Sequence, residues 1–181
     1  IVDFLQSGAL DDNHPTVKFL FCLLDLKKPV VAAVTGAAVG IGTTLLLHCD
    51  LVYADNNAKF QMPFVNLALV PEAASSILLP LIVGQQKAAE LILLGEAFDA
   101  QTAADLNIIN RVVAQDELIS FSLAQAKKLA ALPPLSMQAS KRLLRHNQAE
   151  VKAQMKLELV EFAERLQSDE AKQRFQAFLK K

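Results

Sequence analysis

The stretch at residues 28–76 sets the strongest limit on how this chain can fold. It opens with an apolar, β-branched run at 30–34, which predicts a strand buried on both faces. An apolar helical run at 43–48 follows, and between the two lie three of the chain's six glycines, Gly36, Gly40 and Gly42. Glycines at such a junction let the backbone approach a ligand closely, and a helix start leaves N–H groups unpaired. This geometry suits the binding of an oxyanion.

The second part of this stretch predicts two more short strands and a second helix start. The strands are expected at 50–54 and 59–62, and the helix start at 71–76. Glu72 would then lie in the first turn of that helix, where the dipole favours an acid. We therefore expect the chemistry between the two helix starts.

Helical periodicity covers most of the remaining chain. A helix is expected at 16–26, the second helix start is expected to continue until Pro80, and an edge strand is expected at 108–113. Further helices are predicted at 85–94, 100–106 with Asp99 as cap, 115–131, 135–146, 150–166 and 168–179. The last two have apolar faces too large for an isolated helical pair, formed by Leu157, Val160, Phe162, Leu166, Phe175, Phe178 and Leu179.

Length and composition indicate one compact unit with few classes of partner. The 181 residues predict a core at 1–114 and a helical region at 115–181. Hydrophobic residues make up 52% of the chain, yet no apolar run reaches the ~18–20 residues of a membrane span, so the excess is expected at a subunit interface. With a net charge of −1, the chain lacks the excess of basic residues that is typical of nucleic-acid-binding proteins. We expect neither a nucleic acid nor a membrane as partner.

The cysteines and the two chain ends favour a bacterial cytoplasm. Cys22 and Cys49 match neither a disulfide framework nor a C-x-x-C motif, and the start at Ile1 is not a signal peptide. The C-terminal Leu179-Lys180-Lys181 is not a peroxisomal address of the Ser-Lys-Leu type. A peroxisomal location is therefore less favoured.

The central stretch resembles a known family. The string KPVVAAVTGAAVGIGTTLLLHCDLVYAD, residues 28–55, is similar to the signature of the crotonase (enoyl-CoA hydratase/isomerase) superfamily. Residues 63–76, PFVNLALVPEAASS, resemble the peroxisomal-type Δ3,Δ2-enoyl-CoA isomerases and their bacterial relatives. The resemblance implies an α/β crotonase fold of repeated ββα units, with C-terminal helices that cover the active site and build a homotrimer or hexamer. It also places a further N-terminal β segment of the family upstream of Ile1.

Glu72 is the leading candidate for a catalytic residue. It is the only carboxylate between Asp55 and Glu90, and its neighbours in sequence are mostly apolar. Apolar surroundings disfavour the charged form of a carboxylate, which suits a general base or acid at neutral pH. The alternative is a charge that merely stabilises a helix start. The resemblance favours the catalytic role, because Glu72 matches the glutamate of the family's Pro-Glu-Gly/Ala motif.

The departures from the family pattern favour an isomerase. Hydratases of the superfamily use two glutamates, which align here with Thr44 and Phe64. Water addition needs two acid/base groups, whereas a 1,3-allylic shift in a 3-enoyl-CoA of fatty-acid β-oxidation needs one. The alternatives are a weak hydratase or other CoA-enolate chemistry, and a non-catalytic acyl-CoA-binding protein.

The resemblance also implies an oxyanion hole. It implies that the backbone N–H of Ile41 is one oxyanion donor, and that the second donor lies upstream of Ile1. The expected pocket includes Gly40, Thr44, Phe64 and Asn66, with Gln61 nearby. The G-x-G here is neither a dinucleotide fingerprint nor a P-loop. Coenzyme A is part of the acyl-CoA substrate, so no separate cofactor is expected.

Histidines and basic residues offer weaker signals. His14, His48 and His146 lack the spacing of metal ligands, so no metal site is predicted, and His48 is interpreted as a packing residue with its polar atoms satisfied. The basic cluster at Lys141, Arg142, Arg145 and His146 is either a solvated helix face or a contact for CoA phosphates.

Overall fold

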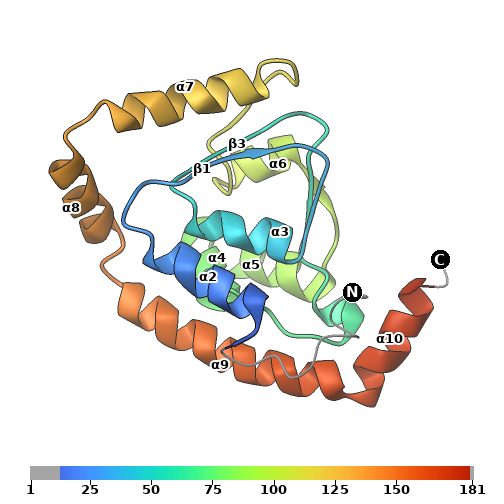
Figure 1. The fold of residues 1–181 in the computed structure, drawn as a ribbon. Helices are drawn as coiled ribbons and strands as arrows, with labels where there is room; N and C mark the ends of the chain where they lie inside the picture. Colours follow the sequence, from blue (N-terminus) through green and yellow to red (C-terminus); the bar gives the residue numbers. More distant parts are fainter. Residues whose placement is uncertain (1–12, 180–181) are drawn as a thin grey trace.

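The computed structural model describes residues 13–179 and arranges them as two small sheets surrounded by helices (Figure 1). Among these residues, the first sheet has the strand order β1-β3-β6 and is parallel throughout; its strands are β1 (Val31–Val34), β3 (Leu51–Ala54) and β6 (Arg111–Val112). In the second sheet β2 pairs parallel with β4, and β4 pairs antiparallel with β5; these strands are β2 (Ala37–Val39), β4 (Lys59–Gln61) and β5 (Phe98–Asp99).

The first four strands alternate between the two sheets, and helical segments follow each of the pairs β1–β2 and β3–β4. β1 turns into β2 at Gly36, whose φ of +69° is a left-handed conformation that glycine adopts without strain. After β2 come α3 (Ile41–Thr44) and the 3₁₀ turn η1 (Leu45–His48). After β3 and β4 come the 3₁₀ turn η2 (Val65–Leu67) and α4 (Ser75–Val83). This repetition is the ββα unit that the resemblance implies.

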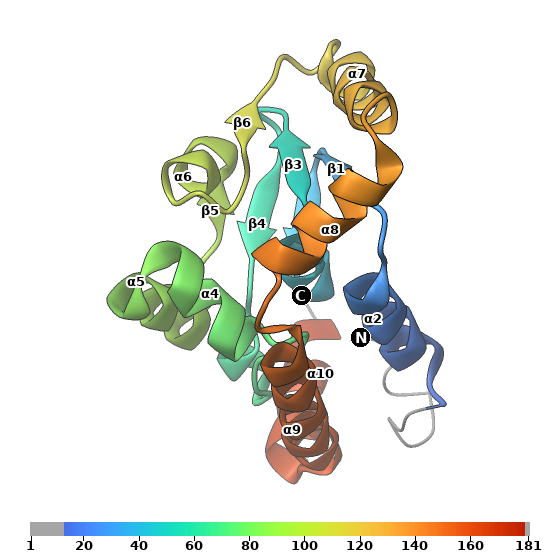
Figure 2. The same cartoon turned by 90° about the vertical axis from the view of Figure 1, so that its left-hand side faces the viewer.

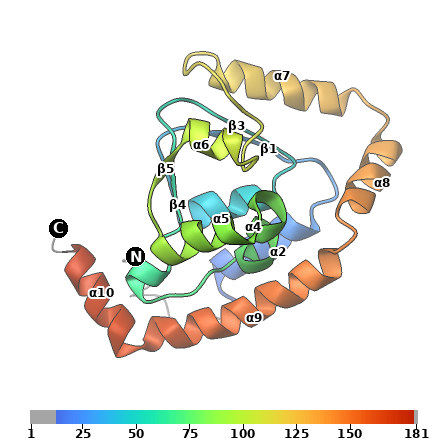
Figure 3. The same ribbon diagram turned by 180° about the vertical axis from the view of Figure 1, so that it is seen from behind.

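The other helices surround these two units. α2 (Pro15–Asp25) precedes β1, and α5 (Gln85–Ala89), the π-helical turn η3 (Glu90–Leu94) and α6 (Ala100–Asp105) follow α4. The C-terminal helices wrap around the core in an arc (Figures 1 and 3); they are α7 (Leu118–Ala130), α8 (Pro134–Leu144), α9 (Gln148–Gln167) and α10 (Asp169–Leu179). In Figure 2, α7 lies at one end of the sheets, and α9 and α10 lie at the other.

The main hydrophobic core draws on both ends of the described chain. Phe60, Met62 and Leu79 are completely buried in it, and Phe60 stacks on Phe98 with ring centroids 5.7 Å apart. α9 and α10 add Phe162, Leu166 and Phe175 to the same core. Part of the predicted apolar face therefore packs inside the chain. Leu157 and Val160 instead remain 62% and 60% exposed, and the side chains of Phe178 and Leu179 lie outside the description.

Two predictions about the strands were wrong in detail. Within the part of the chain that the structure describes, β1 lies at the edge of its sheet next to β3, and Ala33 is exposed, so β1 is not buried on both faces. The edge strand expected at 108–113 shortens to the two residues of β6, whereas Ile108 and Ile109 enter the core from a turn after α6. β2 and β5 were not predicted.

Pro80 does not end its helix, contrary to the prediction. α4 contains Pro80 and continues to Val83. The helix therefore loses one hydrogen bond, to the Ser76 carbonyl in its first turn, and the proline ring crowds that carbonyl. The helix ends instead at Gly84, whose φ is +81° and whose N–H donates to the Pro80 carbonyl at 3.0 Å.

A buried ionic cluster attaches α8 to the first sheet. The Asp50 carboxylate accepts from Lys141 Nζ at 2.7 Å, from Arg145 at 3.1 Å and from the backbone N–H of Val30 at 2.7 Å. Arg145 also donates to the His48 carbonyl. Two residues of the predicted basic cluster are therefore ion-paired within the chain.

Within residues 13–179, no helix has the length and hydropathy needed to cross a bilayer.

Candidate active site

Glu72 lies in a turn that precedes α4. The prediction that it belongs to the first helical turn was wrong, because Ala73 and Ala74 follow it with left-handed φ values of +57° and +55° and α4 begins only at Ser75. L-residues seldom adopt this conformation, since their Cβ crowds the following carbonyl oxygen. The Glu72 carbonyl accepts from the Ser75 N–H at 3.0 Å, which closes the turn.

Two buried side chains hold this turn from distant parts of the chain. Glu158 on α9 accepts from the Ala74 N–H at 2.5 Å, from the Ser76 N–H at 3.0 Å and from the Ser76 hydroxyl. On the other side, His48 Nε2 is 2.7 Å from the Ala73 carbonyl oxygen. Burial lowers the pKa of His48, so its neutral form donates this hydrogen bond. His48 is thus a packing residue with a polar partner, as predicted.

The Glu72 carboxylate has the proton affinity of a group that works at neutral pH. Burial raises its pKa to about 7; a hydrogen bond donated by the Thr44 hydroxyl opposes this rise, and the negative charge of Glu158 adds to it. The Thr44 side chain comes from α3, at the position where the resemblance places a hydratase glutamate. One polar hydroxyl therefore faces Glu72 where a second carboxylate would otherwise stand.

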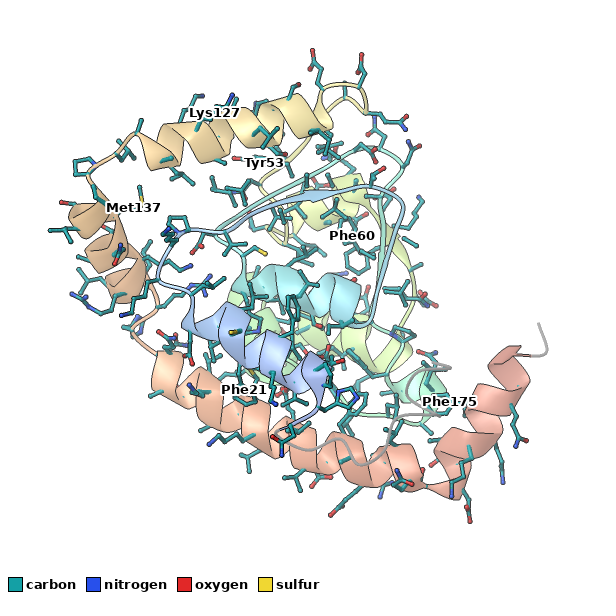
Figure 4. The ribbon with its side chains drawn as sticks, viewed as in Figure 1. Phe21, Tyr53, Phe60, Lys127, Met137 and Phe175 are labelled. Carbon is teal, nitrogen blue, oxygen red and sulfur yellow. The ribbon has the colours of Figure 1, made fainter. Side chains whose placement is uncertain are left out.

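A cavity of about 680 Å³ opens beside Glu72. Its walls are mostly apolar and come from α2, the β2–α3 junction, the segment from β4 to Ala73, and the helices α9 and α10. Figure 4 labels two of these wall residues, Phe21 on α2 and Phe175 on α10. Glu72 is the only carboxylate among the described lining residues. Arg174 on α10, an exposed residue, also contributes to the lining.

The structure gives the expected pocket residues different places. Gly40, Phe64 and Asn66 line the cavity, whereas Thr44 is completely buried behind Glu72. Asn66 Nδ2 donates to the Leu94 carbonyl at 3.0 Å, and Gln61 Nε2 donates to the Gly95 carbonyl at 2.8 Å. A Cβ on Gly95 would lie 1.9 Å from Asn66 Oδ1, so only glycine fits there.

Ile41 presents a backbone donor at the cavity wall. It is the first residue of α3, so its N–H has no acceptor within that helix, and it lines the cavity together with Gly40. Gly40 has φ +57° and ψ −118°, a conformation open to glycine alone. The Gly40 carbonyl accepts from the N–H groups of Thr43 and Thr44 at 2.9 and 3.0 Å, which fixes the start of α3.

Glu158 was not predicted from the sequence. A signal was present, because Glu158 shares a helix face with Met155 and Phe162, three and four residues away, and both are buried. A carboxylate on the buried face of a helix requires hydrogen-bond donors. Its donors, Ala74 and Ser76, could not be identified from the sequence because they lie 84 and 82 residues away.

Comparison with known proteins decides the family. A family model described as enoyl-CoA hydratase/isomerase matches residues 12–181. The chain belongs to the enoyl-CoA hydratase/isomerase family. This is the crotonase superfamily that the central stretch resembled, and solved structures of the family share the fold. The chain superposes on the enoyl-CoA hydratase/isomerase of Pseudoalteromonas atlantica T6c with a TM-score of 0.93 and 45% identity, covering 99% of this chain and 72% of that one.

Family relatives with both kinds of activity in their names are similar to this chain. Enoyl-CoA delta isomerase 2 of Rattus norvegicus is 40% identical over 133 residues, which are 74% of this chain and 34% of the relative. The 2,3-dehydroadipyl-CoA hydratase of Escherichia coli (strain K12) is 35% identical over 142 residues, 78% of this chain and 55% of the relative. The chain thus spans between a third and just over half of these curated relatives.

Proposed function

We propose that this protein isomerises 3-enoyl-CoA to 2-trans-enoyl-CoA, with Glu72 as the single base and acid. The observation that carries the proposal is a single carboxylate among the described residues that line an apolar cavity, with its pKa raised to about 7. A base with a pKa near the working pH is ionised often enough to accept a proton, and its conjugate acid still returns the proton readily.

The proposed reaction moves one proton along the acyl chain. Ionised Glu72 removes a proton from C2 of the 3-enoyl thioester, and the electron pair shifts to give a dienolate. The same carboxyl group then returns the proton at C4, which leaves the double bond between C2 and C3. No water is consumed, so the apolar cavity wall favours this step over addition of water.

The N–H of Ile41 is proposed to stabilise the dienolate oxygen. Negative charge develops on the thioester oxygen when the C2 proton leaves, and a fixed backbone donor in a dry site stabilises that charge strongly. Phe64, buried in the cavity wall, excludes water from this region. We place the second donor upstream of Ile1, as the family resemblance implies.

Hydration is less well supported because no second free carboxylate lines the described part of the cavity. Thr44 and Phe64 occupy the positions of the hydratase glutamates, and Glu158, whose charge acts on Glu72, accepts three hydrogen bonds from the turn that follows Glu72. A carboxylate committed to three donors is poorly placed to activate water.

The proposal predicts much faster isomerisation than hydration. The complete protein, with the chain upstream of Ile1, is incubated with 3-enoyl-CoA and with 2-trans-enoyl-CoA, and the products are separated by chromatography. We expect 2-trans-enoyl-CoA from the first substrate and little 3-hydroxyacyl-CoA from the second. Hydration as fast as isomerisation would contradict the proposal, and binding without either product would indicate an acyl-CoA-binding protein.

We also propose that the protein assembles as a homotrimer or hexamer and works in a bacterial cytoplasm. Large apolar side chains on α7 and α8 are exposed in the single chain, among them Leu135, Leu143 and Leu144 at 82%, 71% and 82%. A surface of this kind is typical of an interface between subunits. Sedimentation of the complete protein at micromolar concentration is expected to show a trimer or a multiple of it, and a monomer would contradict this.

A further inference from the structure

The backbone directly after Glu72 adopts a conformation that its own residues disfavour. Ala73 and Ala74 both have φ values near +55°. Two successive left-handed alanines persist only where the surroundings impose them. The turn therefore depends on contacts made from outside it, and the direction of the Glu72 side chain depends on the turn.

Glu158 supplies most of those contacts. Its Oε2 accepts from the Ala74 N–H, and its Oε1 accepts from both the N–H and the hydroxyl of Ser76. Gln154, one turn earlier on α9, donates to the Ser76 hydroxyl oxygen at 3.0 Å, which directs the hydroxyl proton toward Glu158. The Glu158 side chain is buried and is absent from the cavity lining that the structure describes.

We infer that Glu158 is a positioning residue, which holds the strained turn at Ala73 and Ala74 and thereby fixes the Glu72 carboxylate in the cavity. This inference rests on the proposed role of Glu72 as the base. Glu158 itself touches neither the cavity nor the reacting atoms, so it acts only through Glu72.

The charge of Glu158 gives this role a second, measurable effect. Among the described residues, the groups that act on Glu72 are the Thr44 hydroxyl from α3 and Glu158 from α9, and Arg174 from α10 lines the same cavity. The wall residues from α2 carry no charge, and the buried His48 that contacts Ala73 is held in its neutral form. The charge of Glu158 therefore raises the pKa of Glu72, so removing that charge is expected to lower it.

The test replaces Glu158 with glutamine in the complete protein. Glutamine keeps the size of the side chain, but its single carbonyl oxygen cannot serve both Ala74 and Ser76. Misplacing a catalytic group by about 1 Å costs on the order of 10²-fold in rate. We expect kcat of E158Q, measured well above pH 7 where Glu72 is ionised, to fall by roughly ten- to a hundredfold, with KM nearly unchanged.

Two further variants separate the geometry from the charge. In E158Q/A73G/A74G the glycines adopt the left-handed turn without strain, so kcat is expected to recover while the pKa of Glu72 stays below about 7. Thr44→Val removes a hydrogen bond that lowers this pKa, so the pKa of Glu72 is expected to rise in T44V. A pKa that falls in E158Q and rises in T44V would show that the titration measured is that of Glu72.

The pKa of Glu72 is read without any substrate, by carbon-13 NMR of glutamate-labelled protein, with the signal identified by its absence in E72Q. If isomerase activity is missing from the wild type, the proposed function fails, but the titration still tests Glu158. A fall in thermal stability alone, with kcat and the Glu72 titration unchanged, overturns the inference. If E158Q does not fold, the triple variant is tested in its place, and its failure to fold assigns Glu158 to folding and also overturns the inference.

Discussion

Replacing Glu72 with glutamine is expected to lower kcat for isomerisation by ~10²–10⁴-fold, the usual contribution of a general base. Glutamine keeps the size of glutamate and still accepts the hydrogen bond from Thr44, but it cannot take the C2 proton. No other described residue of the cavity wall carries a carboxylate that could replace it. The loss is therefore expected in kcat, and the Kd for acyl-CoA is expected to change little.

Steady-state kinetics and a binding titration of the complete protein check this prediction. Glu90→Gln is the matched control, because Glu90 is an exposed glutamate paired with Lys87 on the helix surface, and its kcat is expected to equal that of the wild type. In the wild type, kcat is expected to rise with pH through about 7 as Glu72 loses its proton. More than about a tenth of wild-type kcat in E72Q would remove Glu72 from the mechanism.

Replacing Asp50 with asparagine is expected to lower the free energy of unfolding substantially. Asp50 is 21% exposed and is the anion paired with Lys141, which is 7% exposed, and with Arg145. Asparagine keeps the shape and one acceptor oxygen, but it leaves two cations without a counter-charge. Removing one partner of a buried pair costs about 3–5 kcal/mol, and we expect the lower end here because Asp50 keeps some contact with water.

Thermal unfolding of D50N measures this cost. A loss of about 3 kcal/mol lowers Tm by roughly 6–12 °C for a chain of this size. Asp25→Asn is the control, because the Asp25–Lys152 pair is half exposed, at 50% and 41%, and such pairs contribute at most about 1 kcal/mol. Equal Tm values for D50N and D25N would show that the Asp50 cluster does not stabilise the fold.

Local sequence patterns predicted much of this fold because they coincide with local structure. The helices expected at 16–26 and 168–179 and the cap at Asp99 each depend on residues within four positions of one another. β2 was not predicted because it has only three residues, which lie between two glycines. Its pairing with β4 could not be inferred from those three residues alone.

The proposed base and the glycines beside Ile41 could be predicted from the sequence, but the turn that positions the base could not. Glu72 is conspicuous as a lone acid among apolar residues, and the glycines beside Ile41 are conspicuous as well. The left-handed conformation of Ala73 and Ala74 has no sequence signal, because alanine favours helices and would normally extend α4 toward Glu72. Contacts with Glu158 and His48, which are distant in sequence, override that preference.

Because Glu158 is far in sequence from the turn that it holds, the candidate site is completed late in the synthesis of the chain. Synthesis from the N-terminus produces the sheets, Thr44 and Glu72 well before Glu158, which follows Ser76 by 82 residues. Closing so long a loop carries an entropic cost that the docking of α9 must offset. Before α9 docks, the proposed base lacks the contacts with Glu158 that hold the turn after it. The proposed base thus acquires its orientation from a helix made after the sheets, α3 and α4.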